Sequence, residues 1–257
     1  KKRGFARLSG FVNGVLRSIG RQKDQIHWPE KNKDEILYLS VKYSLPQWLI
    51  CFFEKTYDKK TVELMDGSFL EERKTSLYCM SRDGGKDALK KDLEAEDICV
   101  EDGLICQNAL RISGYDSLYR LRGFREGRCF VQDESSMLAA SIADVKEGQF
   151  VLDLCSAPGG KALYMADQMH GTGMVIARDL TEDKTNLIEE NIERTELENI
   201  RTEVFDARNL DEEMISKADV VLADLPCSGL GIMGRKNDIK YNVSLDGMED
   251  LVKLQKK

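Results

Sequence analysis

The feature that most constrains this chain is an alternation of strand-like and helix-like segments after Gly123. Strands are predicted at four short apolar runs, residues 150–154, 174–177, 200–205 and 219–223. Helices are predicted between them at residues 160–169, 182–197 and 211–216. Because a helix that connects two strands of one sheet makes a right-handed crossover, this order predicts an α/β fold with a parallel, doubly wound sheet.

Each predicted strand has an aspartate at or near its carboxyl end: Asp153, Asp179, Asp206 and Asp224. A single aspartate is common in turns, but four in corresponding positions line one edge of a sheet. In doubly wound sheets, ligands bind at that edge, near the point where the strand order reverses. We therefore expect the binding site there.

A turn of small residues follows the first of these aspartates: Cys155, Ser156, Ala157, Pro158, Gly159, Gly160 and Lys161. It is not the dinucleotide fingerprint GxGxxG, because Ser156 and Ala157 occupy the region where a pyrophosphate needs bare backbone. Gly159 and Gly160 let the backbone approach a ligand, and the next helix offers N–H groups to a carboxylate. Asp179 lies about 20 residues further on, the spacing at which an acid binds ribose hydroxyls.

These features predict S-adenosylmethionine as the ligand, since it has a ribose, an amino-acid end and a positive sulfonium that carboxylates attract. The predicted cofactor-binding residues are Cys155, Ser156, Ala157, Pro158, Gly159, Gly160, Lys161, Asp179, Asp206 and Asp224. An oxidoreductase with a nicotinamide cofactor is the alternative on a similar sheet. The missing GxGxxG and the four acids, which repel a diphosphate, argue against it.

A second informative stretch, "DLPCSGLG", begins at Asp224. A lone cysteine is usually structural, but Cys227 follows the ligand-binding end of a strand, where an exposed thiol is a candidate for chemistry. A thiolate that adds to C6 of cytosine makes C5 nucleophilic toward a methyl donor, and an acid near N3 assists. The residues alone thus predict Cys227 as the nucleophile and Asp224 as the acid. Basic residues further on, candidates for phosphate contacts, are Arg235, Lys236 and Lys240.

The stretches "LDLCSAPGGK" and "DLPCSGLG…RKNDIK" resemble the bacterial RsmB (Sun, Fmu) type of RNA cytosine-5 methyltransferase, which is related to the NSUN and nucleolar enzymes. The resemblance implies a Rossmann-like class I methyltransferase sheet, S-adenosylmethionine as cofactor and 16S ribosomal RNA as substrate. It also changes one role. In this family the nucleophile lies in a later Thr-Cys-Ser motif, and the cysteine corresponding to Cys227 promotes release of the methylated product.

The sequence departs from the family pattern at three positions. Ser156 and Leu225 each stand where alanine is usual, and Arg178 stands where an apolar residue commonly precedes the acid. None of these changes removes a functional group.

Three domains are predicted. Residues 1–25 form a basic amphipathic helix that resembles the end of the NusB-like helical domain of RsmB proteins, with a helix docked on the main body as the alternative. Residues 26–120 form a small α+β RNA-binding or linker domain, with strands at 75–80 and 104–113. Residues 121–257 form the methyltransferase domain, which we expect to be incomplete, because only four parallel strands are present and no cysteine follows Cys227. We expect a fragment that binds the methyl donor without completing the reaction.

Composition bounds the partners. The 257 residues carry a formal net charge of −7, which argues against a generally basic surface but not against a local RNA-binding groove. Seven dispersed cysteines and only two histidines predict reduced thiols in the cytoplasm and no metal site. No apolar run reaches the roughly 18 residues of a membrane span, so no membrane partner is expected. The oligomeric state is open, with a monomer expected. The alternatives in function are a non-catalytic RNA-binding ribosome-assembly factor and a cytosine-5 methyltransferase that acts on transfer RNA.

Overall fold

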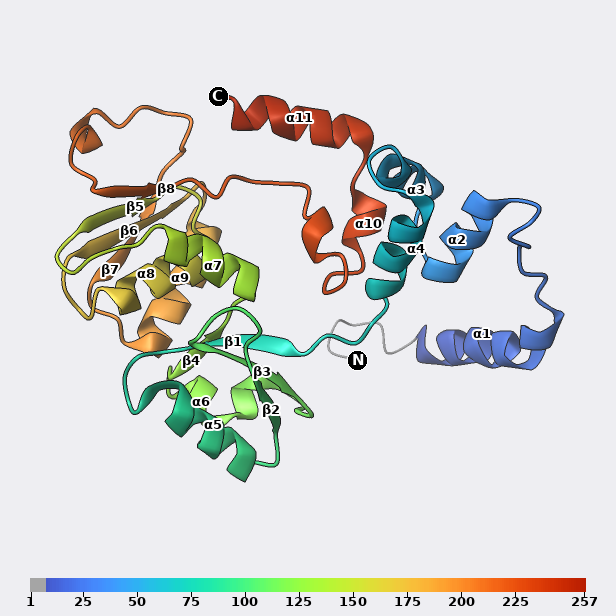
Figure 1. Ribbon diagram of the computed structural model, residues 1–257, viewed down its shortest axis with the longest axis horizontal. Coiled ribbons are helices and arrows are strands. Elements are labelled where there is room, and N and C mark those ends of the chain that lie inside the picture. Colours follow the sequence, from blue (N-terminus) through green and yellow to red (C-terminus); the bar gives the residue numbers. More distant parts are fainter. Residues whose placement is uncertain (1–7) are drawn as a thin grey trace. The chain divides into compact units, whose positions relative to one another are not determined.

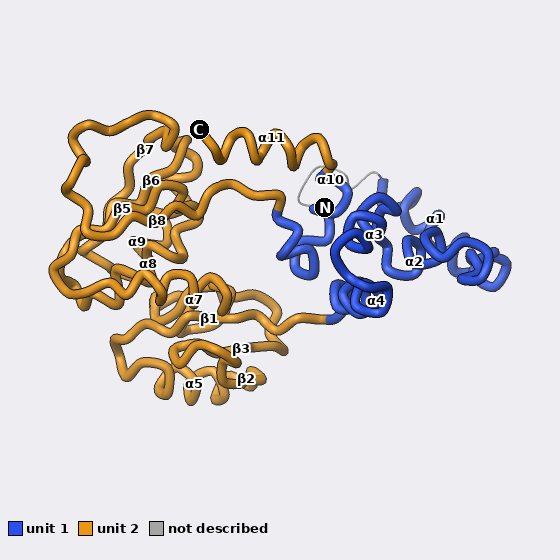
Figure 2. The backbone as a smooth tube through the Cα atoms, turned by 45° about the horizontal axis from the view of Figure 1, so that its top comes forward, with its two compact units in different colours: residues 1–71, 229–243 blue, residues 72–228, 244–257 orange. Residues whose placement is uncertain are grey.

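The computed structural model describes residues 8–257, and these form two compact units (Figures 1 and 2). The first unit contains the described residues up to Glu71 together with Gly229–Val243, and the second contains Glu72–Ser228 and Ser244–Lys257. These boundaries differ from those of the domains expected at residues 1–25, 26–120 and 121–257, which stay a prediction.

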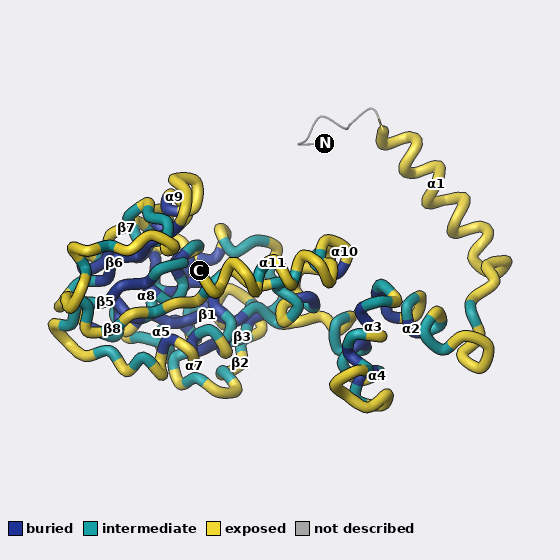
Figure 3. Tube along the Cα trace, turned by 90° about the horizontal axis from the view of Figure 1, so that it is seen from above, coloured by how far each residue is buried: buried dark blue, intermediate teal, exposed yellow. Residues whose placement is uncertain are grey.

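The first unit is helical. Its elements are α1 (Ser9–Gln22), a 3-10 turn (Lys23–Gln25), α2 (Glu35–Tyr43), α3 (Gln47–Glu54), α4 (Lys59–Ser68), a second 3-10 turn (Leu230–Ile232) and α10 (Ile239–Asn242). No residue of α1 is buried, and Figure 3 shows it exposed along its whole length. Residues 1–7, which include part of the predicted basic helix, lie outside the described residues. Among the described residues no single helix is long and apolar enough to cross a membrane; α2 and α3 reach that length and composition only as a pair bent by 113°.

The core of the first unit includes residues from a distant part of the sequence. Leu49, Ile50 and Val62 are fully buried, and Met233 packs with them at 1% exposure. The sequence predicts that residues 229–243 belong to the methyltransferase domain, as a loop with basic side chains. Instead, this segment contributes apolar side chains to the helical core, and Lys240, an expected phosphate contact, is buried at 4% exposure.

An antiparallel sheet begins the second unit. Its strands are β1 (Thr75–Cys79), β2 (Cys99–Asp102), β3 (Ala109–Ser113) and β4 (Cys129–Val131), in the order β2-β3-β1-β4, accompanied by α5 (Gly85–Ala95), a 3-10 turn (Leu118–Arg120) and α6 (Arg122–Arg125). The strand predicted at 104–113 is shorter than expected. The Glu134 carboxylate accepts hydrogen bonds from the N–H groups of Leu104, Ile105 and Cys106 at 2.7–3.1 Å, which holds these residues in a loop.

A parallel sheet follows, and it confirms the predicted fold class. Its strands are β5 (Phe150–Asp153), β6 (Met174–Asp179), β7 (Ile200–Val204) and β8 (Val220–Leu222), in the order β7-β6-β5-β8. The helices of this part are α7 (Glu134–Ile142), α8 (Gly160–Gln168), α9 (Glu182–Thr195) and α11 (Leu245–Gln255), with a 3-10 turn at Glu212–Met214 where a short helix was expected. Strand order reverses between β5 and β8, so the site is expected at the carboxyl ends of these two strands.

The two sheets of the second unit share one core. Tyr78 of β1 packs against Tyr164 of α8, with ring centroids 4.8 Å apart and the ring planes tilted by 55°. Its hydroxyl donates to the buried Asp167 carboxylate at 2.6 Å, and the same carboxylate accepts from the Ser81 hydroxyl at 2.9 Å. Burial, the Asp167 charge and this hydrogen bond raise the pKa of Tyr78, so the phenol stays a donor. The antiparallel layer is thus fixed to α8, the helix that begins at the small-residue turn.

Asp66 in the first unit makes stability depend on pH. It is fully buried, neither carboxylate oxygen has a hydrogen-bond partner, and burial together with Glu63 and Glu54 raises its pKa from 3.8 to about 6. A raised carboxyl pKa means that the folded state binds the proton more tightly. The contribution of Asp66 is therefore most favourable below about pH 4, falls as the pH rises to about 6, and costs on the order of 3 kcal/mol above that.

We expect Asp66→Asn to raise the free energy of unfolding of the first unit at pH 8 by about 1–3 kcal/mol and to remove this slope between pH 4 and 6. Urea unfolding monitored by tryptophan fluorescence measures this, because Trp28 and Trp48 both lie in the first unit. Glu71→Gln, which changes an exposed carboxylate, is the control. A slope that persists in Asp66→Asn contradicts the assignment.

Candidate functional site

The turn between β5 and α8 is held in place by the neighbouring strand β6. The Ser156 N–H donates to the Arg178 carbonyl at 2.8 Å, and the Ala157 N–H donates to Asp179 Oδ2 at 2.9 Å. The Ala157–Pro158 peptide is cis. Two strands that are neighbours in the sheet thus fix the backbone of the turn before any ligand is considered.

Asp179 is the organising carboxylate of this site. It is 3% exposed, and burial by itself raises its pKa. Hydrogen bonds from the Lys184 ammonium at 2.7 Å and from the N–H groups of Ala157 and Leu180 outweigh burial, so the pKa of Asp179 is lowered. These three donors leave capacity on a carboxylate, which has about four acceptor positions.

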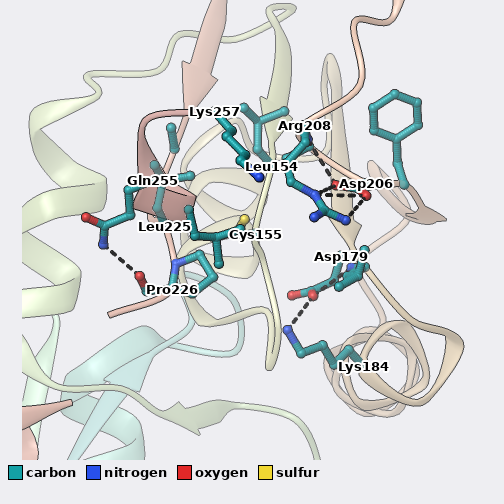
Figure 4. A pocket seen from close by; sticks show the side chains of 15 residues that line it. Leu154, Cys155, Asp179, Lys184, Asp206, Arg208, Leu225, Pro226, Gln255 and Lys257 are labelled. Atoms are coloured by element: carbon teal, nitrogen blue, oxygen red, sulfur yellow. Dashed lines mark hydrogen bonds and ion pairs between the residues drawn. The ribbon is translucent and has the colours of Figure 1, made fainter. Parts of the chain in front are cut away.

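A cavity of about 420 Å³ lies at the carboxyl ends of the parallel strands (Figure 4). Its lining consists of Leu154, Cys155, Asp179, Leu180, Lys184, Phe205, Asp206, Ala207, Arg208, Ala223, Leu225, Pro226, Leu254, Gln255 and Lys257. The volume is within the range of small-ligand pockets. Of the ten predicted cofactor residues, Cys155, Asp179 and Asp206 line this cavity. The other seven, from Ser156 to Lys161 and Asp224, do not.

The charges at the site are more balanced than the sequence indicates. Asp206 forms an ion pair with Arg208 at 2.5 Å, whose hydrogen bonds lower the pKa of Asp206 to about 2, and Asp224 forms an ion pair with Lys161 at 2.5 Å. With Lys184 beside Asp179, three of the four strand-end acids have a basic partner. The expected repulsion of a diphosphate is therefore weaker than the count of acids implies, and the turn sequence is the better argument against a dinucleotide.

Asp153 differs from the other three acids. It is 1% exposed, and its Oδ1 has no hydrogen-bond partner. Burial raises the pKa of Asp153 to about 6, and the nearby charge of Lys161 opposes this only in part. Asp153, like Asp224, is not in the cavity lining, so two of the four predicted acids, Asp179 and Asp206, line the cavity.

The structure leaves the predicted roles of Cys227 and Asp224 untested. Cys227 is exposed, and neither residue lines the cavity. The loop that carries Cys227 is held by α11, because Gln255 Nε2 donates to the Pro226 carbonyl at 2.7 Å (Figure 4). The role of Cys227 as nucleophile or as release cysteine, and the role of Asp224 as acid, stay predictions.

The Arg178 departure from the family pattern has a structural explanation. Its side chain is buried at 3% exposure between Glu203, at 2.8 Å, and Asp211, at 2.6 Å. The guanidinium also lies over the Phe205 ring, 4.2 Å from the centroid. A buried cation is thus balanced by two carboxylates, and its carbonyl still supports the turn.

Most of the residues that line the cavity are not predicted from the sequence. Three of them, Leu180, Ala207 and Leu225, each directly follow one of the predicted aspartates. The strand pattern that predicts the aspartates therefore also indicates these three residues. Lys184 and Arg208 lie a few residues later, in the segments that leave the strands. Gln255, the last residue of α11, and Lys257, two residues after it, also line the cavity, and no local pattern in the sequence indicates this.

A parallel sheet with this strand order, a turn of small residues held by the acid of the second strand, and a cavity at the strand ends together define a Rossmann-like class I methyltransferase domain. Residues 140–257 match the family described as 16S rRNA methyltransferase RsmB/F. The predicted resemblance is therefore confirmed, and these residues correspond to a domain of that family.

Relatives extend the similarity to nearly the whole chain. The chain is 34% identical over 256 residues to the probable ribosomal RNA small subunit methyltransferase B of Bacillus subtilis (strain 168), covering 99% of this chain and 57% of the relative. It is 29% identical over 253 residues to the ribosomal RNA small subunit methyltransferase B of Yersinia pestis bv. Antiqua (strain Angola), covering 96% of this chain and 56% of the relative. The chain thus spans somewhat more than half the length of these curated relatives.

Solved structures support the same fold. The crystal structure of PH0851 superposes with a TM-score of 0.81 at 26% identity, over 89% of this chain and 52% of that one. The structure of NSun6 from Pyrococcus horikoshii with SFG gives a TM-score of 0.73 at 18% identity, over 82% of this chain and 77% of that one. The second similarity concerns the fold alone.

Gly159 is the position in the turn where glycine is required. Its φ is +99°, and a Cβ there lies 2.9 Å from Ile188 Cγ2 of α9. We expect Gly159→Ala to lower the free energy of unfolding of the second unit by about 2–4 kcal/mol through backbone strain and overpacking. Gly171→Ala is the matched control, because Gly171 also has a positive φ, +76°, but no atom within 4 Å of a built Cβ; it should cost only about 1 kcal/mol.

Urea unfolding monitored by far-ultraviolet circular dichroism compares the two variants. Equal losses of stability in Gly159→Ala and Gly171→Ala contradict close packing of the turn against α9.

Proposed function

We propose that this chain provides the methyl-donor-binding part of an RNA cytosine-5 methyltransferase whose substrate is 16S ribosomal RNA. The observation that carries the proposal is the Asp179 carboxylate, which holds the small-residue turn and lines the strand-end cavity within a domain of the RsmB/F family. The names of the relatives, ribosomal RNA small subunit methyltransferase B, support the ribosomal substrate.

The residues present fit S-adenosylmethionine. Leu180, Leu225 and Pro226 give the cavity an apolar wall that suits an adenine ring, and Asp179 has acceptor capacity for ribose hydroxyls. The amino-terminal end of α8 has no side-chain cap and offers N–H groups to a carboxylate. When bound, this cofactor supplies an electrophilic methyl group. We keep the turn from Cys155 to Lys161, with Asp179, Asp206 and Asp224, as the proposed binding residues.

For Cys227 we propose the role that the family resemblance implies, release of the methylated product. For Asp224 we propose the role that the residues alone predict, the acid that assists at N3 of the cytosine. The sequence contains no Thr-Cys-Ser motif, so we expect this chain alone to bind the methyl donor without turnover.

We propose that the small α+β part of the second unit and the exposed helix α1, with Arg17 and Arg21, each bind flanking RNA. Reaching a cytosine inside structured RNA needs an unpaired or flipped base, which requires such flanking contacts. All seven cysteines are free, which supports the proposal of a reducing, cytoplasmic location. We also propose that the protein is a monomer.

Donor binding is the direct test. We expect calorimetric titration to show binding of S-adenosylmethionine and none of NAD. Asp179→Asn removes the carboxylate that fixes the turn and that would accept hydrogen bonds from the ribose hydroxyls. It should weaken the binding of S-adenosylmethionine at least about tenfold. Asp183→Asn, an exposed aspartate in the first turn of α9, is the matched control. Binding of NAD instead, or equal affinity in Asp179→Asn and the unmodified chain, contradicts the proposal.

Methyl transfer tests the role of Cys227. With S-adenosylmethionine carrying a labelled methyl group and unmethylated 16S ribosomal RNA, we expect binding of the donor but no labelled RNA. Labelled RNA that disappears with Cys227→Ser would instead make Cys227 the nucleophile, as the residues alone predict. Binding of RNA without binding of the donor would favour the non-catalytic assembly factor, and transfer RNA labelled in the same assay would identify the other substrate class.

A further inference from the structure

Asn191 of α9 connects the small-residue turn to the rest of the second unit. Its Nδ2 donates to the Pro158 carbonyl at 3.1 Å and to the Leu187 carbonyl at 3.1 Å. Its Oδ1 accepts a hydrogen bond from Arg194 Nη2 at 2.8 Å. A flipped amide would turn its oxygen toward two carbonyl oxygens and its NH2 toward a guanidinium, so these three bonds fix the orientation of the amide.

Arg194 is in turn fixed by the antiparallel layer. Its Nη1 donates to the Phe124 carbonyl of α6 at 2.9 Å and to the Cys129 carbonyl of β4 at 2.8 Å. The guanidinium lies over the Phe124 ring, 4.1 Å from the centroid. Gly127, with φ of +67°, packs directly on this end of α9, because a Cβ there would lie 1.8 Å from the Arg194 carbonyl oxygen. These contacts fix the backbone of α9 at Arg194 and hold its guanidinium beside Asn191.

We propose that Asn191 is a positioning residue for the methyl-donor turn and that Arg194 acts through it, by setting the direction in which the Asn191 amide faces Pro158. This inference rests on the proposed function for the identity of the ligand. The hydrogen bonds form a continuous path from the backbone of α6 and β4, through two side chains of α9, to the backbone of the turn. The same two side chains and Pro158 also line a hollow of about 150 Å³ beside the turn.

Two variants separate the two ends of this path. Asn191→Asp keeps the shape of the side chain and an acceptor for Arg194, but places an oxygen against the Pro158 carbonyl. Asn191→Ala removes the hydrogen bonds to both Pro158 and Arg194. It provides a second test in case Asn191→Asp does not fold. Asn186→Asp makes the same chemical change at an exposed position of α9 and is the matched control.

The first measurement needs no ligand. We expect hydrogen–deuterium exchange at the backbone amides of residues 159–162 to accelerate in Asn191→Asp and Asn191→Ala, and to be unchanged in Asn186→Asp. Melting curves confirm that each variant is folded. Unchanged exchange in both Asn191 variants overturns the positioning role, whatever the chain binds.

The second measurement uses S-adenosylmethionine as the probe. We expect its Kd to rise about three- to tenfold in Asn191→Asp. Arg194→Met should weaken binding in the unmodified chain and add nothing in the Asn191→Ala background, because Arg194 acts through Asn191. Independent, additive effects on Kd overturn that role for Arg194. If the unmodified chain binds no S-adenosylmethionine, the proposed function fails, and the exchange measurement still decides the role of Asn191.

Discussion

The hydrogen bond from the Ala157 N–H to the Asp179 carboxylate is the contact on which the site depends. It joins a turn after one strand to the end of the next strand, so it forms only when β5 and β6 pair in parallel and in register. A carboxylate that accepts backbone N–H groups is stabilised as an anion, which explains why a buried Asp179 stays charged. The sheet therefore sets the shape of the turn, and the turn sets where a ligand can approach the backbone.

The charge at this edge of the sheet is set by ion pairs between acidic and basic side chains, and the acidic side chains do not form an unbalanced negative cluster. Asp179, Asp206 and Asp224 each have a basic partner, supplied by Lys184, Arg208 and Lys161. Such pairs keep the carboxylates oriented and limit their mutual repulsion. Selectivity at the cavity then depends on where hydrogen-bond acceptors and apolar walls lie, and much less on the net charge of the acids.

The sequence predicted the parallel sheet because its signals are local. Each strand is a short run with an aspartate at its end, as in β5 and β6, or two residues beyond it, as in β7 and β8. Helical periodicity follows directly after β5 and β6. Where long-range contacts decide the structure, prediction failed. The Glu134 carboxylate converts the start of a predicted strand into a loop at Leu104–Cys106. The four acids were predicted because their positions follow from the local strand pattern. The basic partners of three of them and the contribution of α11 to the cavity depend on long-range contacts, so they were not predicted.

The chain passes between its two units three times, after Glu71, after Ser228 and after Val243. Neither unit is therefore a continuous piece of sequence. Excising the second unit by a single cut near residue 72 would strip Met233 and its apolar neighbours of their helical core and leave them facing water. Cys227 lies two residues before Gly229, where the chain enters the first unit, so the loop that carries the thiol is also a covalent connection between the two units.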